Sequence, residues 1–236
     1  MPPCDPAPAE GLVWRFAEGQ HKISTMKLVD TLDEQRLLEE LLDETKPPVP
    51  PDCAHLHYLL STPFRYPARH ATRFRRAGDA RGVFYAAETP EVAAAEMAFY
   101  RLLFFLESPA TEPPRAASEF TAFSVRYACF RLDLTGPEWA GQPGLREPVD
   151  YGFCHDLADR VRAAGAGAIR YPSVRDPGQG RNLAILTCGA FARPTPVRQE
   201  GWHFRVSRAR VIAIGPSRAL EFDAATWDDP RLRPQT

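Results

Sequence analysis

Apolar residues recur at helical spacing in three segments of the chain. Leucines at 37, 38, 41 and 42 follow Thr31 and Glu34, which have the form of an N-terminal capping box. A helix is therefore predicted from residue 31 to the Lys-Pro-Pro sequence at 46–48. Thr89 and the proline after it predict the start of a second helix, which extends to about residue 106. A third, amphipathic helix is predicted over 150–164.

Short apolar or alternating segments predict strands between these helices. In the longest segment the apolar positions change parity near Cys129, which predicts a β-bulge there. Because strands and helices do not alternate regularly, the pattern favours an α+β fold over a doubly wound one. Residues 55–76 are predicted to be irregular. The predicted strands are 12–16, 82–87, 121–135, 168–171, 183–186 and 203–214.

The chain of 236 residues has the length of one domain. We predict a flexible N-terminal arm at 1–11, a domain over 12–214 with a longer insert at about 30–67, and a C-terminal extension at 215–236. With 29 basic and 30 acidic residues, the net charge of −1 argues against a globally basic nucleic-acid binder. No apolar run reaches the roughly 18 residues that span a bilayer.

Two further features concern the cellular compartment. The first residues lack the basic and apolar regions of a signal peptide, which predicts a cytoplasmic protein. The five cysteines are scattered, at positions 4, 53, 129, 154 and 188. An odd and scattered set in a reducing compartment predicts free thiols.

Glu96 is the most informative candidate for chemistry. Its neighbours on the predicted helix are apolar or aromatic, namely Val92, Phe99, Tyr100 and Leu103. An unpaired charge along such a stripe is costly. Two interpretations therefore remain open at this stage, a salt-bridged core acid and a functional carboxylate in a cleft.

Six arginines fall within 17 residues of this neutral protein. Guanidinium groups bind phosphates in a bidentate manner, so this cluster predicts an anion site, with a solvated basic loop as the alternative. Arg15 is a separate case, because a lone arginine inside an apolar run needs a partner or a ligand. The six clustered residues are Arg65, Arg69, Arg73, Arg75, Arg76 and Arg81.

The common catalytic and nucleotide-binding motifs are absent. The chain contains no GxxxxGK[ST], GxGxxG, HExxH or GxSxG sequence. His55 and His57 form an HxH pair, but no third ligand lies at a familiar zinc spacing, so we predict no metal site. Ser173 and Asn182 flank a loop with two glycines, where each can either bond a ligand or cap a turn.

Several of these residues occur in an order that resembles the RES domain family. The sharpest match is the segment 82–89, which contains Tyr85, followed by the alanines and Glu96 of 93–96. The segment 171–175 together with 180–184 is similar to the C-terminal motif of the family. The resemblance covers roughly residues 12–214. The family's Gly-Arg-Trp-Asn sequence is replaced by residues 72–75, so the family arginine is either Arg73 or Arg75.

The resemblance implies a fold and an activity. The implied fold is similar to that of ADP-ribosyltransferases, with a mixed or antiparallel sheet flanked by helices. The implied activity is consumption of NAD by hydrolysis, phosphorolysis or ADP-ribosyl transfer, with NAD as the substrate and no further cofactor. Toxins of toxin–antitoxin pairs occur in this family, with a helix-turn-helix protein as the antitoxin, and members are often dimers. Water, phosphate and a protein side chain all remain open as acceptors.

The resemblance also implies roles for particular residues. Glu96 would stabilise positive charge on the ribose as the nicotinamide leaves, and Tyr85 would stack on the nicotinamide or close the pocket. Ser173 would bond the carboxamide or a phosphate. The implied catalytic residues are Glu96, Tyr85, Arg73 and Ser173, and the implied NAD-binding residues are Arg15, Arg75, Arg65 and Asn182. The alternative is a non-catalytic module that binds RNA or phosphate through the arginines of 65–81.

Overall fold

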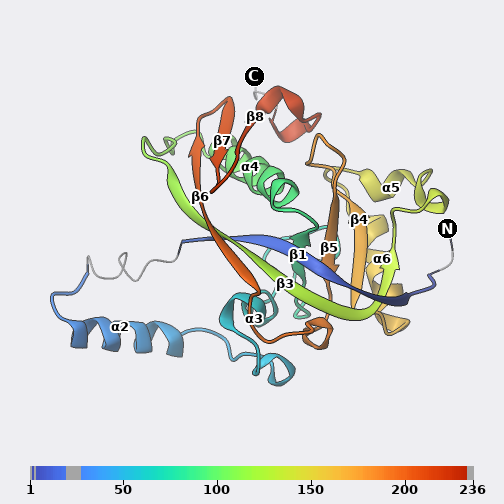
Figure 1. The fold of residues 1–236 in the computed structure, drawn as a ribbon, viewed down its shortest axis with the longest axis horizontal. Helices are drawn as coiled ribbons and strands as arrows, with labels where there is room; N and C mark the ends of the chain where they lie inside the picture. The colour runs from blue at the N-terminus through green and yellow to red at the C-terminus, as the bar shows by residue number, and fades with distance from the viewer. Residues whose placement is uncertain (1, 3, 20–27, 233–236) are drawn as a thin grey trace.

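The computed structural model describes residues 2, 4–19 and 28–232, and it shows an α+β fold built on a single sheet (Figure 1). The α-helices are α2 (Leu32–Glu44), α3 (Tyr58–Arg65), α4 (Pro90–Glu107), α5 (Pro143–Arg146) and α6 (Gly152–Ala163). The strands are β1 (Ala7–Glu18), β2 (Phe84–Ala87), β3 (Ser118–Asp133), β4 (Ala168–Pro172), β5 (Arg181–Ile185), β6 (Arg198–Val206), β7 (Arg210–Ile214) and β8 (Ala219–Asp223). Short 3-10 helices lie between several of these elements.

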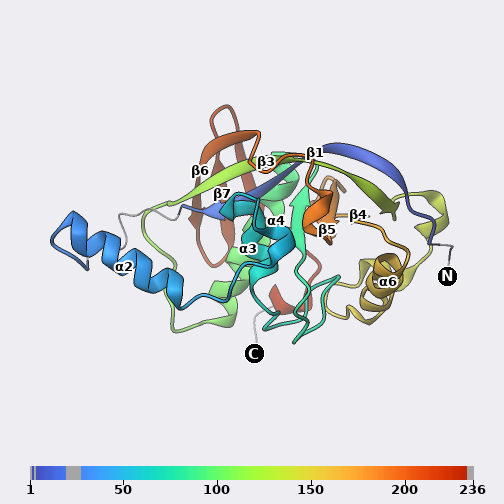
Figure 2. The ribbon, with the colours of Figure 1, turned by 90° about the horizontal axis from the view of Figure 1, so that it is seen from below.

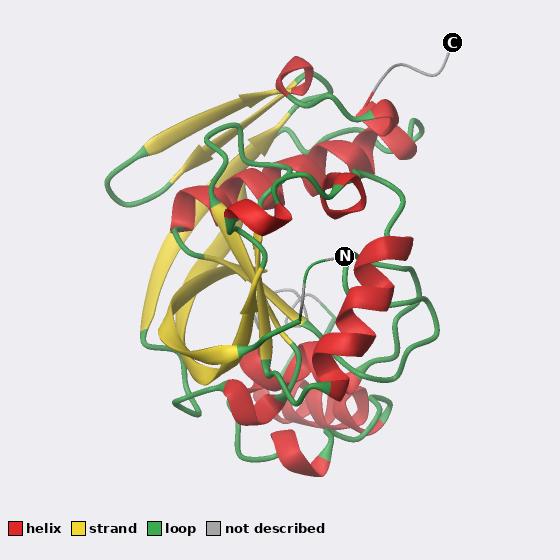
Figure 3. Ribbon diagram, turned by 90° about the vertical axis from the view of Figure 1, so that its right-hand side faces the viewer, coloured by secondary structure: helices red, strands yellow, loops and turns green. Residues whose placement is uncertain are grey.

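The sheet closes on itself at one end. The strand order is β1-β2-β5-β4-β3-β6-β7-β8, and β1 also pairs with β3, so the first five strands form a ring. Among these pairs only β3 and β4 run parallel. The long pairing of β1 with β3 supports the ring, and β6, β7 and β8 extend from β3 as an antiparallel meander. Figure 3 shows the strands gathered on one side and most helices on the other.

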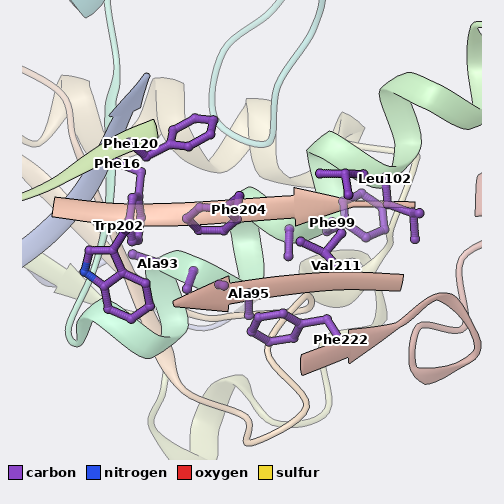
Figure 4. Packing of buried hydrophobic residues seen from close by; sticks show 14 of the residues in the cluster. Phe16, Ala93, Ala95, Phe99, Leu102, Phe120, Trp202, Phe204, Val211 and Phe222 are labelled. Carbon is purple, nitrogen blue, oxygen red and sulfur yellow. The ribbon is translucent and has the colours of Figure 1, made fainter. Parts of the chain in front are cut away.

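Three apolar clusters hold the helices against the sheet. The first lies between α4 and strands β6, β7 and β8, where Phe99, Trp202 and Phe204 are fully buried (Figure 4). The second packs α3 against β2, β3 and β5, and the third packs α6 against β4 and β5. In Figure 2 helices α3, α4 and α6 lie below the long strands β1 and β3. Burial on several sides fixes α4 firmly beside the sheet.

Local signals at the start of α4 behave as the sequence predicts. The Thr89 hydroxyl accepts a hydrogen bond from the Val92 N–H at 3.3 Å, and Pro90 occupies the first helical position. The helix follows β2 almost directly, so a side chain in its second turn lies near the end of that strand. The capping box of α2 is also confirmed, because the Thr31 N–H donates to the Glu34 carboxylate and the Glu34 N–H donates to the Thr31 hydroxyl.

The predicted bulge in β3 is wrong. The register with β1 runs without interruption from Ala7 opposite Arg131 to Glu18 opposite Phe120. The parity change has another cause: β3 is buried on both faces by different clusters. Val125 packs on one face with the second cluster, whereas Leu132 packs on the other face with the third. The alternation therefore shifts without an extra residue in the strand.

Other boundaries differ from the prediction as well. Helix α3 lies inside the segment predicted to be irregular, and β1 begins at Ala7, within the predicted arm. The segment 203–214 is part of a hairpin of β6 and β7, whose turn is closed by the Ser207 N–H and the Arg210 carbonyl at 2.8 Å. That turn contains no glycine or proline, so the sequence carries no strong signal for it. The predicted C-terminal extension contains β8, which pairs with β7.

The prediction that all five cysteines are free thiols is also wrong in the structure. Cys53 and Cys188 form a disulfide, with their Cα atoms 5.3 Å apart and a sequence separation of 135 residues. The bond joins the segment before α3 to the chain after β5. The remaining cysteines at 4, 129 and 154 are free. A pair so distant in sequence has no spacing signal, since only the folded chain brings it together.

None of the described helices is both long enough and apolar enough to cross a membrane.

The disulfide leads to the first testable prediction. Replacing Cys53 and Cys188 together by alanine should lower the free energy of unfolding of the oxidised protein by about 2–4 kcal/mol, because the bond closes a long loop. Chemical denaturation with and without reductant measures this difference, and reductant should bring the wild type close to the variant. Titration of the denatured, unreduced wild type should find three reactive thiols. Five reactive thiols would contradict the disulfide.

Candidate active site

A cavity of about 280 Å³ lies where β1, β2, β5 and α4 meet the loop that follows β4. Its wall includes six aromatic side chains, three arginines and a single acidic side chain. Pockets of this kind, apolar with a few converging polar groups, are typical of ligand sites. The lining residues are Trp14, Arg15, Phe16, Thr72, Arg73, Tyr85, Ala86, Ala87, Ala93, Glu96, Met97, Tyr100, Tyr151, Tyr171, Val174, Arg175 and Asn182.

Glu96 is the acidic side chain of this wall, and two neutral groups hold it. Its Oε1 atom accepts hydrogen bonds from the Ser173 hydroxyl at 2.7 Å and from the Asn182 amide at 2.6 Å. No arginine or lysine in the described part of the chain forms an ion pair with it. The interpretation as a salt-bridged core acid is therefore wrong, and the carboxylate faces the cavity.

The side-chain oxygen of Asn182, which neighbours Glu96, has no hydrogen-bond donor in the described structure. It lies on β5 between Ala87 of β2 and Tyr171 of β4, and its side chain is buried. Its Nδ2 atom donates to Glu96, whereas its Oδ1 atom is buried without a hydrogen-bond partner in the structure. Buried polar atoms are rarely left unpaired, so a ligand with an N–H or O–H group suits this position.

Arg15 enters the cavity from β1, where the sequence predicted a residue in need of a partner. Its Nη1 atom donates to the Tyr85 carbonyl at 2.8 Å, and its guanidinium lies over the Phe84 ring at 5.0 Å. Burial lowers the pKa of Arg15 to about 10, against the opposing effect of Tyr85 and Tyr171. The side chain stays charged at neutral pH, and it forms no ion pair with an acidic side chain of the described residues.

Tyr85 connects β2 to the segment that carries Arg73. Its hydroxyl lies 2.8 Å from the Thr72 hydroxyl and accepts a hydrogen bond from the Phe74 N–H at 3.0 Å. Burial raises the pKa of Tyr85 to about 12, although the hydrogen bonds and nearby arginines act in the opposite direction. The phenol is therefore neutral, and its ring forms part of the cavity wall.

The structure brings Arg73 to the cavity and leaves Arg75 outside its lining. Arg73 is buried, and its guanidinium donates to the carbonyls of Leu145 at 2.7 Å and Glu147 at 3.0 Å. Arg75 is directed to the other side, where it donates to the carbonyls of Tyr66 and Asp79. Of the two candidates for the family arginine, geometry favours Arg73.

The remaining members of the arginine cluster lie outside the cavity lining. Arg65 contacts the Pro47 carbonyl. Arg76 pairs with Asp156 at 2.7 Å, and Arg81 pairs with Asp79 at 2.7 Å. Because protein groups already contact most of the guanidiniums in 65–81, the cluster offers few of them to an external phosphate. The interpretation as an RNA-binding loop is correspondingly weakened.

Sequence reasoning missed several residues of the wall. Arg175 and Tyr151 line the cavity, and Tyr151 lies under the Arg73 guanidinium at 5.2 Å. Tyr171 also lines it, and burial together with nearby Glu96 raises the pKa of its phenol well above the usual value. Arg175 and Tyr171 lie within two residues of Ser173 in sequence, so the motif around Ser173 could have indicated that both residues lie at the site. Tyr151 has no such signal, because only the tertiary fold brings the start of α6 to this site.

Comparison with known proteins gives one finding about the family. A family model described as RES domain matches residues 49–207, about two thirds of the chain. No curated protein matches the sequence. The matched range includes Arg73, Tyr85, Glu96, Ser173 and Asn182, whereas Arg15 lies before it.

We expect the hydroxyl of Tyr85 to contribute to the stability of the fold. Tyr85→Phe should lower the free energy of unfolding by about 1–2 kcal/mol, since the Phe74 N–H loses its acceptor. The raised pKa means that the phenol stabilises the fold fully below its ordinary value of 10.0, and this contribution is lost as the pH rises toward about 12. Denaturant unfolding of both proteins from about pH 8 to pH 11 should show the difference shrinking.

Tyr58→Phe is the matched control, because Tyr58 is 56% exposed and lies away from the cavity. Its stability should equal that of the wild type. Equal stability of Tyr85→Phe and the wild type at neutral pH would contradict the hydrogen bonds assigned to Tyr85.

Proposed function

The chain belongs to the RES domain family, and on this premise we propose that it is an enzyme that consumes NAD by cleaving the bond between nicotinamide and ribose. The observation that carries the proposal is the setting of Glu96. It is the one acidic side chain among the lining residues, it is held by neutral donors, and Arg15 and Arg73 line the same cavity.

The charges around the cavity suit an anionic dinucleotide. Arg15 and Arg73 form hydrogen bonds with carbonyl groups and no ion pair with an acid in the described residues. Buried cations without an acidic partner are costly, and a bound pyrophosphate would supply the missing negative charge. The aromatic wall would take the rings of the ligand, and the unfilled Oδ1 of Asn182 would accept a hydrogen bond from the carboxamide.

The chemistry follows from where charge develops. When the bond between the nicotinamide nitrogen and ribose C1′ breaks, the electron pair leaves with nicotinamide, and positive charge develops on the ribose. A carboxylate fixed beside the ribose stabilises that charge. Both described contacts of Glu96 go to Oε1, so Oε2 is left to face the ligand. Water or a protein side chain that bonds to C1′ then loses its proton to solvent, whereas phosphate bonds through an oxygen that carries no proton.

The acceptor distinguishes three forms of this proposal. Water would give free ADP-ribose, inorganic phosphate would give its 1-phosphate, and a protein side chain would become ADP-ribosylated. We extend the proposal to the role of toxin in a toxin–antitoxin pair, with a helix-turn-helix antitoxin and with a homodimer as the expected assembly. This extension is supported by the family resemblance alone.

The third prediction tests the proposed activity. The purified protein should consume NAD, and Glu96→Gln should lower the rate by about 10²-fold or more, because the charge facing the ribose is removed. Glu107→Gln is the matched control on the same helix, where the side chain is exposed outside the cavity. Product analysis with and without phosphate then identifies the acceptor.

Two results would contradict the proposal. Equal NAD loss by the wild type and Glu96→Gln would exclude Glu96 from catalysis. Salt-sensitive RNA binding that falls as each arginine of 65–81 is replaced and survives Glu96→Gln, with no NAD loss in either buffer, would favour the binding module instead.

A further inference from the structure

The last described residues of the chain return to the helix that carries Glu96. The 3-10 helices Ala224–Thr226 and Pro230–Leu232 follow β8, and the second of them contacts α4. Trp227 and Leu232 are buried in the same apolar cluster as Phe99 of α4. The Trp227 and Phe99 rings meet edge to face at 5.5 Å. These residues lie beyond the range matched by the family model, which ends at residue 207.

Asp229 is the buried charge of this segment. Its side chain is 1% exposed, and its Oδ2 atom lies 2.9 Å from the Arg175 guanidinium. The same oxygen lies 2.8 Å from Arg231. Burial opposes ionisation of Asp229, but the hydrogen bonds from Arg231 and the charges of Arg231 and Arg175 outweigh it and lower the pKa of Asp229. The carboxylate therefore neutralises Arg175, which lines the cavity.

Several groups besides Asp229 hold Arg175 in place. Its guanidinium lies 3.9 Å from the centre of the Phe99 ring and donates to the Pro148 carbonyl at 2.9 Å. Its own carbonyl accepts a hydrogen bond from the Trp227 indole at 2.6 Å. The side chain and the backbone of residue 175 are thus both fixed by the C-terminal segment.

The backbone of residue 175 in turn fixes Ser173. The Ser173 hydroxyl oxygen accepts hydrogen bonds from the backbone N–H groups of Arg175 at 3.2 Å and Asp176 at 3.0 Å. A hydroxyl has one proton and two acceptor positions. With both acceptor positions filled, the proton is directed to Glu96, 2.7 Å away. The orientation of this hydroxyl therefore depends on where residues 175 and 176 lie.

We propose that the segment 224–232 is a positioning element of the active site, in which Asp229 acts through Arg175 to keep Ser173 against Glu96. Asp229 itself is not among the residues that line the cavity. The proposal rests on the proposed NAD cleavage for its kinetic consequence alone. Its structural consequence, the order of the loop 173–180, does not depend on any substrate.

The fourth prediction concerns Asp229→Asn. Loss of the charge leaves Arg175 buried beside Arg231 without its counter-ion. Hydrogen exchange of the backbone amides in 173–180 should become faster, while exchange in β1 and β3 stays as in the wild type. In NAD cleavage kcat should fall about tenfold to a hundredfold with KM within about twofold, since the loss is one of positioning. Asp223→Asn is the matched control, because it breaks an exposed pair with Arg210.

A double variant tests whether Asp229 acts through Arg175. Replacing the buried pair by apolar groups, Arg175→Met with Asp229→Leu, removes the buried charge of Arg175 together with its partner, while Arg231 is 26% exposed and keeps its hydrogen bond to the Pro148 carbonyl. This variant should restore most of the loop protection and of kcat. The double variant also keeps the test open if Asp229→Asn alone does not fold.

The proposal is overturned if exchange of 173–180 in Asp229→Asn matches the wild type. It is also overturned if exchange rises equally throughout the protein, or if the double variant recovers neither protection nor kcat. A wild type that consumes no NAD would overturn the proposed function, and the exchange measurement would still decide the role of Asp229.

Discussion

The hydrogen bonds that Ser173 and Asn182 donate to Glu96 connect the parts of this molecule that matter for its site. A carboxylate on the apolar side of α4 needs hydrogen-bond donors, and neither of the two described donors to Glu96 comes from its own helix. The donors come from β5 and from the loop after β4, more than 70 residues away along the chain. The closed pairing of β1, β2, β5, β4 and β3 is what brings these elements to the end of β2, where α4 begins. A shift of any of these strands would leave the charge unsatisfied.

The cavity is lined by more basic than acidic side chains, with three arginines and one glutamate. Within the described residues, Arg15 and Arg73 have carbonyl partners and no acidic ones, whereas Arg175 is neutralised by Asp229. The charges of two of the three lining arginines are therefore not offset by a described acidic side chain. Desolvation of Arg15 lowers its pKa to about 10, which is a cost of this arrangement in the free protein. Under the proposed function, the pyrophosphate of a bound NAD would offset this cost.

The sequence predicted the local features of the site well and the long-range ones poorly. Glu96 and Arg15 stand out because a charge in an apolar run is visible in the sequence itself, and the cap at Thr89 fixes the start of the helix. The choice between Arg73 and Arg75 required the tertiary contacts of each guanidinium. The disulfide of Cys53 and the ion pair of Asp229 with Arg175 were not predicted for the same reason, because the partners lie 135 and 54 residues away in sequence. The parity change in β3 led to a wrong prediction of a bulge, because two apolar clusters bury opposite faces of this strand.

We propose that the cavity holds NAD with its ribose beside Glu96. A crystal structure of Glu96→Gln with NAD bound would locate the residue 96 side chain against ribose C1′. We expect a separation of about 3.5 Å, with the pyrophosphate against Arg15 and Arg73. NAD bound elsewhere on the protein, or bound here with its ribose far from residue 96, would contradict it.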